Sequence, residues 1–480
     1  MASVKQNLAY STLLTMSTYL VPLIVFPYIS RTLGVGGIGI VDTIDNMIDY
    51  CILFSMMGLT SVGVREIAKN KDNPEALSQT FTDLFALNLC STAFIALVFV
   101  LIVALSPTLQ GYGMLIPIGI LKLTANLFWI EWFYTGLEEF RYITLRSIIL
   151  RTIFVLAVFL LVHCETDVTV YYTLFTGITV GNAVCNWYHK RSYLHWNLRR
   201  ANIKRYLKSF FMLGIFAMLS AIYFKLSLPV LSFITNNQEA GNYATATRVY
   251  QVVIALISTL TAVMIPRMSV LMKENKIDEV RNYTDIAFKL LFLFSFPIIC
   301  FVELFSPDII RLFAGTGFEG AIMPMRIIML QLIVIGAEKI IVLQLLIPLR
   351  KDNTIVKAGF AGVIVWTLLT ILLVPKFSSM GTAIVWVAAE TTVLIIATIE
   401  TNRSLEICFP FRQLFLSVGF AIPYLLIGWL VLMITHQPVI RILLCIPLFV
   451  TYASVLETKV YQTGIIKAIF NVIFKTSDHA

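Results

Sequence analysis

Charged residues are scarce in this sequence. Asp, Glu, Lys and Arg together make up 13% of its 480 residues, about half the share that is typical of a soluble globular protein. This scarcity excludes a water-exposed surface over most of the chain. Hydrophobic residues make up 58% of the sequence instead, and apolar runs of about 18 or more residues, each long enough to cross a bilayer, recur from end to end. The composition predicts an all-α, polytopic membrane protein.

Residues with reactive side chains are few and scattered. The seven cysteines form no C-x-x-C pair and have no histidine at metal-binding spacing, so neither a metal nor another cofactor is expected. The five histidines fall in predicted loops or at the ends of apolar runs, which argues against an acyltransferase with a buried histidine base. The sequence also lacks a phosphate-binding P-loop motif. An enzyme is therefore not expected.

The apolar runs predict about fourteen membrane-spanning helices joined by short loops. The predicted spans cover residues 8–30, 38–63, 79–105, 112–136, 144–163, 168–188, 209–235, 241–266, 284–305, 318–348, 354–374, 380–400, 413–435 and 438–456. Most Lys and Arg residues fall on one side of this arrangement, among them the basic run HKRSYLHWNLRRANIKRYLK. The other side receives only Arg31, Arg311, Lys376 and Arg441. Positive loops face the cytoplasm, so both termini are expected there, and the net charge of +9 indicates topology rather than a nucleic-acid partner.

The sequence repeats itself at an offset of 202 residues. The matched pairs are Pro27 and Pro229, Ser30 and Ser232, Gly39 and Gly241, and Arg65 and Arg267. Likewise FTD at residues 81–83 returns as YTD at residues 283–285. Because six spans are an even number, the two copies are expected to be related by a pseudo-two-fold axis along the membrane normal. The predicted organisation is a six-helix lobe (1–188), a basic cytoplasmic linker (189–208), a second six-helix lobe (209–400), and an additional helix pair with a tail (401–480).

Charged residues inside the predicted spans are the first candidates for function, because an intramembrane charge is costly and usually faces a cavity or a partner. In IVDTIDNMIDY the aspartates Asp42, Asp45 and Asp49 have the spacing of one helix face. Lys122 and Lys225 lie near the middle of their spans. We expect both lysines to line a cavity and the aspartates to face it, keeping the cations paired when no anion is bound.

Other charges have plainer interpretations. Arg248 could snorkel or pair with Glu338 or Glu390. Arg31 could cap the carbonyl groups at the end of the first span. Sequence reasoning leaves these alternatives open.

Two motifs resemble those of a known family. PYISRTLGVGGIG at residues 27–39 and GLTSVGVREIA at residues 58–68 are similar to the P-Y-[LI]-[ST]-R-x-L-G-x-x-G-x-G and R-E-[IV]-A motifs of bacterial polysaccharide and O-antigen unit flippases (Wzx type). These flippases belong to the multidrug/oligosaccharidyl-lipid/polysaccharide (MOP) exporter superfamily. The predicted number of spans, the duplication, the extra helix pair and the basic central loop extend this resemblance over the whole chain.

The resemblance implies a V-shaped pair of lobes around a partly cationic central cavity that opens alternately to each side of the bacterial cytoplasmic (inner) membrane. The implied substrate is an oligosaccharide linked through pyrophosphate to a polyprenol, and it moves from the cytoplasmic to the outer leaflet. Membrane lipids and other polysaccharide-assembly proteins are the implied partners. The candidate residues for binding the pyrophosphate are Arg31, Lys122, Lys225 and Arg248. The candidate gate or hinge residues are Pro27, Gly34, Gly36, Gly37 and Gly39.

Two alternative functions stay open. A cation-coupled multidrug antiporter of the same superfamily would use the acidic face of the second span, although Lys122 and Lys225 argue against it. A polysaccharide polymerase or acyltransferase is disfavoured by the short outer loops. Coupling to H⁺ or Na⁺ is also open. The residues for ion coupling, or merely for balancing charge, are Asp42, Asp45, Asp49, Glu131 and Glu390.

Overall fold

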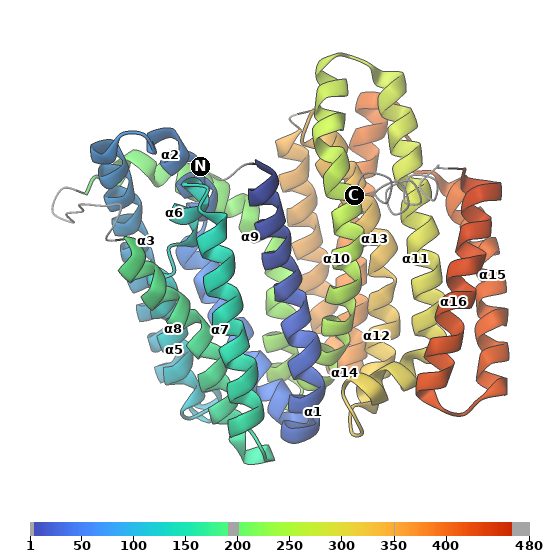
Figure 1. Cartoon of the computed structure of the whole chain (residues 1–480), viewed down its shortest axis with the longest axis horizontal. Coiled ribbons are helices and arrows are strands. Elements are labelled where there is room, and N and C mark those ends of the chain that lie inside the picture. Colours follow the sequence, from blue (N-terminus) through green and yellow to red (C-terminus); the bar gives the residue numbers. More distant parts are fainter. Residues whose placement is uncertain (1–3, 191–200, 350, 463–480) are drawn as a thin grey trace, which may run out of the picture. The chain divides into compact units, whose positions relative to one another are not determined.

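The computed structural model describes residues 4–190, 201–349 and 351–462, and within them the chain is almost entirely helical, with no strand (Figure 1). The α-helices are α1 (Val4–Met56), α2 (Leu59–Asn70), α3 (Pro74–Leu105), α4 (Pro107–Gln110), α5 (Leu115–Phe128), α6 (Glu131–Gly136), α7 (Phe140–Leu161), α8 (Val168–His189), α9 (Lys204–Ile234), α10 (Asn237–Lys273), α11 (Ile277–Phe313), α12 (Ile322–Met329), α13 (Gln331–Lys339), α14 (Asp352–Leu405), α15 (Phe411–Ile434) and α16 (Pro438–Leu456). Short 3-10 or π-helical segments lie at Glu165–Asp167, Glu319–Ala321, Ile340–Leu346 and Glu457–Tyr461. The predicted all-α class is confirmed.

Ten helical segments of the described chain are long and apolar enough to cross a membrane. Two of them, in α1 and α14, are about twice the length that one crossing needs. Each contains one residue with non-helical backbone angles, Gly34 (φ 68°) in α1 and Ser378 (φ 48°) in α14. These helices therefore each contain two of the predicted spans.

Contacts show that both long helices double back at these residues. Leu14, before Gly34, and Met56, after it, pack against the same cluster of buried side chains. The two ends of α14 also meet, since Lys351 Nζ lies 2.9 Å from Glu400 Oε1. At Gly34 a positive φ costs little because glycine has no Cβ. The PYISRTLGVGGIG motif thus makes the turn between the first two spans.

The span predicted at 38–63 extends too far, while those predicted at 112–136 and 318–348 are found as the candidate membrane spans Leu115–Gly136 and Glu319–Leu346 but are interrupted inside. The span predicted at 38–63 ends at Met56, because Met57 takes a positive φ of 36° and a separate helix, α2, begins at Leu59. The span at 112–136 breaks after α5, where the Glu131 amide donates to the Trp129 carbonyl in a tight turn before α6. The span at 318–348 is divided among α12, α13 and the π-helix Ile340–Leu346.

The chain forms two compact units, Met1–Ala244 and Thr245–Ala480. In the first unit α9 packs against α1, α2 and α3, so the helix predicted to open the second lobe belongs by its contacts to the first unit. In the second unit α15 and α16 pack against α11. The predicted lobe boundary rests on a different criterion, internal repetition, and it stays a prediction. The basic linker also stays a prediction, and half of it, residues 191–200, lies outside the described residues.

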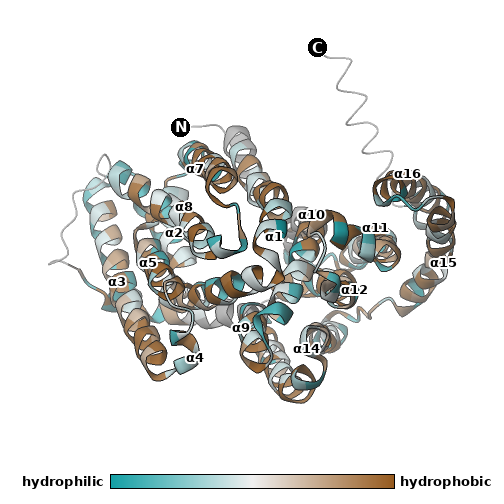
Figure 2. Cartoon of the chain, turned by 90° about the horizontal axis from the view of Figure 1, so that it is seen from below, coloured by the Kyte–Doolittle hydropathy of each residue, from teal (hydrophilic) through white to brown (hydrophobic). Residues whose placement is uncertain are grey.

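The last two helices of the second unit are hydrophobic and partly exposed (Figure 2). Figure 2 shows α15 and α16 as predominantly hydrophobic along their length. One face of α15, with Phe415, Ile422 and Trp429, is exposed, while Tyr424 and Val431 of the same helix are buried in the cluster against α11. An apolar helix that exposes large hydrophobic side chains in this way is suited to contact with lipid.

Gly39 and Gly241, which are matched by the internal repeat, lie side by side, and each contacts the backbone of the segment that contains the other. A Cβ on Gly39 of α1 would collide with the backbone carbonyl of Asn237 and lie 2.9 Å from the Gly241 amide nitrogen. A Cβ on Gly241 of α10 would collide in turn with the Val35 carbonyl. Backbones approach this closely only where both residues lack side chains. These positions fix the packing of the turn in α1 against the start of α10.

We predict that Gly39→Ala destabilises the protein by about 1–3 kcal/mol, the usual cost of overpacking. The matched control is Gly36→Ala on the same helix, where a Cβ meets no atom within 4 Å. Alanine is also the better helix former there. The measurement is thermal unfolding of the purified protein in detergent. A melting temperature lowered equally by both substitutions would contradict the close approach.

Candidate functional site

Four charged side chains from three helices form a cluster inside the first unit. Lys122 Nζ of α5 lies 2.5 Å from Asp45 Oδ1 and 2.8 Å from Asp49 Oδ1 of α1. Lys225 Nζ of α9 lies 2.5 Å from the second oxygen, Oδ2, of Asp49. We call this set the aspartate–lysine cluster. Its three ion pairs join α1, α5 and α9.

Residue spacing on α1 and a glycine on α5 bring these side chains together. Asp45 and Asp49 are four residues apart, so they stand one turn above each other on α1. Gly119 precedes Lys122 by nearly one turn of α5, and a Cβ there would lie 2.7 Å from Ile48 and 3.3 Å from the Tyr172 hydroxyl. The glycine therefore lets α5 approach α1 closely enough for Lys122 to reach both carboxylates.

The cluster balances its own charge, with two carboxylates facing two ammonium groups. The Lys122 side chain is buried, with 9% of its surface exposed, and its ammonium lies 5.3 Å from the centre of the Phe175 ring. Lys225 and Asp49 are more open, at 29% and 30%. Removing one partner of a buried ion pair strands a charge at a cost of about 3–5 kcal/mol. Because Lys225 is more exposed than Lys122, an arriving anion would meet Lys225 first.

The remaining candidates of the first unit lie outside the cluster. Asp42 is buried one turn before Asp45, and its carbonyl accepts a hydrogen bond from Asn46. Arg31 is exposed and donates to the carbonyl of Pro27, which fits the interpretation of a cap at the end of the first span. The turn separates Arg31 from Asp45, which lies eleven residues, or about 16 Å of helix, beyond Gly34.

Glu131 belongs to a different buried network. Its Oε2 accepts from Arg146 Nη2 at 3.0 Å and from the Trp129 indole at 2.8 Å. Arg146 also donates to the Asn186 side chain. Sequence reasoning assigned Arg146 only to a cytoplasmic helix end and missed Asn186, since neither has a motif. Glu131 of α6 thus balances the charge of Arg146 of α7, and Arg146 connects both helices to Asn186 of α8.

In the second unit two acidic side chains from different helices come together. Glu338 of α13 and Glu390 of α14 lie close enough for their carboxyl groups to interact. The Trp386 indole donates to Glu390 Oε1 at 3.2 Å, and the buried Tyr250 ring stands 5.3 Å from Trp386. The Tyr250 hydroxyl has no hydrogen-bond partner among the described residues. Arg248 is half-buried in the same unit.

Geometry of this kind defines a class of protein: a helical, multi-pass membrane protein with paired charges buried between its spans. The solved structure titled "Lipid II flippase MurJ, inward closed conformation" has a similar fold, with a TM-score of 0.73 and 15% identity over 94% of this chain and 99% of that one. A second is titled "Inward-facing conformation of a multidrug resistance MATE family transporter of the MOP superfamily", with a TM-score of 0.63 and 14% identity over 82% and 94% of the two chains. This chain therefore shares the fold of these two structures.

The sequence itself identifies the family. Residues 4–272 match the family described as "Polysaccharide biosynthesis protein", and the chain belongs to it. A relative from Escherichia coli (strain K12), named "Putative O-antigen transporter", is 23% identical over 84% of this chain and 98% of its own length. The expected link to polysaccharide biosynthesis is confirmed by the family match. The roles of the individual site residues stay predictions.

We predict that Lys122→Met destabilises the protein by about 3–5 kcal/mol, because it strands Asp45 and leaves Asp49 with one partner. The double variant Lys122→Met/Asp45→Asn should recover part of this loss, since coupled charges are not additive. Unfolding in a denaturing detergent measures both. Lys376→Met, at an exposed lysine, serves as the control, with an expected change within about 0.5 kcal/mol. A double variant no more stable than Lys122→Met would contradict the pairing.

Proposed function

We propose that the protein is a transporter, not an enzyme, and that it flips a polyprenyl-pyrophosphate-linked oligosaccharide from the cytoplasmic to the outer leaflet of the bacterial inner membrane by alternating access. Both termini would then be cytoplasmic. The family match supports the link to polysaccharide biosynthesis. The observation that supports the proposal is the aspartate–lysine cluster, whose two ammonium groups would offer cationic partners to a pyrophosphate that crosses the membrane.

The cluster suits transient binding of an anion. When the pyrophosphate approaches Lys225, the ammonium can exchange Asp49 for a phosphate oxygen, and Asp49 keeps Lys122 as its partner. Asp45 and Asp49 then share the ammonium of Lys122, so each charged group keeps a partner and binding avoids the large cost of a fully unpaired buried ion. Because the carboxylates compete for the same lysines, the anion is also released again. Moderate affinity of this kind is what a transport cycle requires.

A second candidate function is a cation-coupled multidrug antiporter. Asp42 adds a third acidic residue to the two paired carboxylates of α1, and an acidic face of this kind would attract cationic compounds. The ion pairs oppose this function, since both lysines already neutralise Asp45 and Asp49. The flippase is therefore the better supported of the two.

Transport by purified protein in proteoliposomes tests the proposal. The substrate is a fluorescent oligosaccharide on a pyrophosphate-linked polyprenol, and a leaflet-specific glycosidase reports its movement. The same vesicles are tested for uptake of a cationic dye. We expect movement of the lipid and no uptake of the dye. Uptake of the dye without movement of the lipid would refute the flippase and support the antiporter.

In this assay Lys225→Gln is expected to reduce the rate of lipid movement by about tenfold or more, because one charge-assisted contact to the pyrophosphate is lost. The matched control is Lys289→Gln, whose lysine is 31% exposed and pairs with Asp285 at 2.8 Å, much as Lys225 pairs with Asp49. Equal rates for the Lys225 variant and the unmodified protein would remove Lys225 from the substrate path.

Glu338 and Glu390 are our candidates for ion coupling. Two neighbouring carboxylates repel each other, and one proton or sodium ion shared between them removes that repulsion. We predict that Glu390→Gln abolishes the acceleration of transport by an imposed proton or sodium gradient and leaves transport driven by membrane potential intact. Glu303→Gln, at a carboxylate 38% exposed beside Arg326, is the control. A gradient response that survives in Glu390→Gln would exclude the role of this pair.

A further inference from the structure

Trp129, at the end of α5, stands apart from the core cluster around Trp132. Its neighbours in the sequence, Leu127 and Ile130, are buried in that cluster together with Trp132. Trp129 itself is only half-buried and is not among the side chains packed against the cluster. Within the described parts of the chain, no other aromatic ring contacts its indole. A tryptophan of this kind can offer the face of its ring to a ligand.

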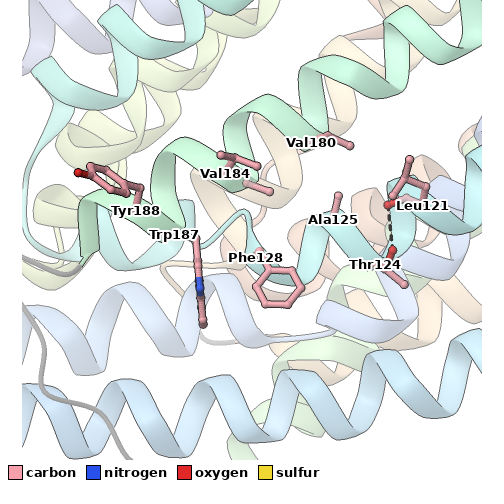
Figure 3. A pocket seen from close by; sticks show the side chains of 9 residues that line it. Leu121, Thr124, Ala125, Phe128, Val180, Val184, Trp187 and Tyr188 are labelled. Atoms are coloured by element: carbon pink, nitrogen blue, oxygen red, sulfur yellow. Dashed lines mark hydrogen bonds between the residues drawn. The ribbon is translucent and has the colours of Figure 1, made fainter.

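Trp129 lies on the face of α5 that carries Lys122. Lys122, Asn126 and Trp129 follow one another at the spacing of one helix face, and Trp129 stands about 10 Å along the helix from Lys122. Another face of α5, with Leu121 and Phe128, lines an apolar cavity between α5 and α8 (Figure 3). Trp129 is therefore on the side of α5 that holds the aspartate–lysine cluster, nearer the end predicted to be cytoplasmic.

Glu131 stands beside Trp129 with one carboxylate oxygen unused. Its Oε2 accepts two hydrogen bonds, from the Trp129 indole at 2.8 Å and from Arg146 Nη2 at 3.0 Å. Its Oε1 accepts none from the part of the chain that the structure describes, and 35% of the side chain is exposed. The two bonds hold the carboxylate in place, so Oε1 is left to accept from a hydroxyl group of a ligand.

The charges around this pair oppose a cationic ligand. Arg151 of α7 is near enough for its charge to interact with those of Glu131 and Arg146, and its Nη1 donates to the Leu14 carbonyl at 3.2 Å. Two guanidinium groups thus accompany one carboxylate. An aromatic ring beside a lone carboxylate would attract a cation, but the excess of positive charge here repels one.

A sugar ring has the chemistry that this pair would recognise. The C–H bonds on one side of a sugar ring are weakly positive and pack against the negative face of an indole. Its hydroxyl groups donate to a carboxylate in short, charge-assisted hydrogen bonds. A hydrocarbon chain could cover the Trp129 ring, but it would leave Glu131 Oε1 without a donor, at a cost in free energy. The pair therefore selects a sugar over a lipid chain.

We propose that Trp129 and Glu131 bind a sugar of the oligosaccharide while its pyrophosphate is held at the aspartate–lysine cluster. The inference rests on the proposed function, because a substrate that joins sugars to an anion can occupy both places at once. Arg146 is a positioning residue: it orients Glu131, and its own side chain is only 4% exposed. This subsite would let the protein distinguish a carrier lipid loaded with sugar from an empty one.

Binding to the full-length protein tests the subsite with two probes, the fluorescent oligosaccharide lipid of the transport assay and polyprenyl pyrophosphate without sugar. We expect Trp129→Leu to raise the Kd of the oligosaccharide lipid by about tenfold and to leave the Kd of the sugar-free probe unchanged. Trp129→Phe keeps an aromatic face and should lose less affinity than Trp129→Leu. The matched control is Trp429→Leu, at a tryptophan of α15 that is 49% exposed, and it should change neither Kd.

Two results with these probes would overturn the inference. One is a Trp129→Leu variant that binds both probes as tightly as the unmodified protein does. The other is an equal loss of affinity for both probes in Trp129→Leu and Trp129→Phe, because a sugar subsite cannot affect the binding of a lipid without sugar.

Glu131→Gln tests the carboxylate. A neutral amide oxygen accepts weaker hydrogen bonds than a carboxylate does, so we expect a Kd about fivefold higher for the oligosaccharide lipid and an unchanged Kd for the sugar-free probe. Glu303→Gln is the matched control, at a carboxylate 38% exposed beside Arg326.

The transport assay separates this inference from the proposed function. Unchanged binding in the Trp129 and Glu131 variants, while the protein still moves the oligosaccharide lipid, would refute the subsite and leave the proposed function standing. Binding of the free oligosaccharide that is lost in Trp129→Leu, by a protein that moves no lipid, would refute the proposed function and keep the subsite.

Discussion

Asp49 uses both of its carboxylate oxygens for ion pairs, one with Lys122 and one with Lys225. This single side chain therefore connects α1 with α5 and α9 inside the membrane, where an unpaired charge is costly. The arrangement of the first unit depends on that constraint. Any movement that separates α9 from α1 must give Lys225 a new anionic partner. Under the proposed function the pyrophosphate would be that partner, and its binding would be coupled to the movement of α9.

The internal repeat explains why α9 packs within the first unit. Asp83 and Asp285 occupy equivalent positions, and each binds the start of a later segment: Asp83 accepts from the Asn202 amide at 2.7 Å, and Asp285 accepts from the Gln413 side chain. The first contact holds the segment that leads into α9, and the second holds the start of α15. The two matched aspartates thus each accept a hydrogen bond from a later segment, one from a backbone amide and one from a side chain.

Sequence reasoning predicted the helical class, most helix positions and the residues of the cluster, because intramembrane charges and apolar runs are strong signals that do not depend on context. It predicted the positions of the helix breaks poorly. Nothing in the apolar run around Trp129 indicates that α5 ends there, since the break depends on the Glu131–Arg146 pair formed with another helix. Trp132, in the same apolar run, is buried against Gly63 and Phe81. Such tertiary contacts have no local sequence signature.

The placement of charge on α5 resolves a difficulty in moving an amphiphile across a bilayer. The head group is too polar for hydrocarbon, and the long chain is too apolar for a channel that suits the head. One face of α5 presents Lys122 to the carboxylates, while Leu121 and Ala125 line a cavity between α5 and α8. Under the proposed function, a helix with one charged and one apolar face would suit both parts of the lipid-linked substrate.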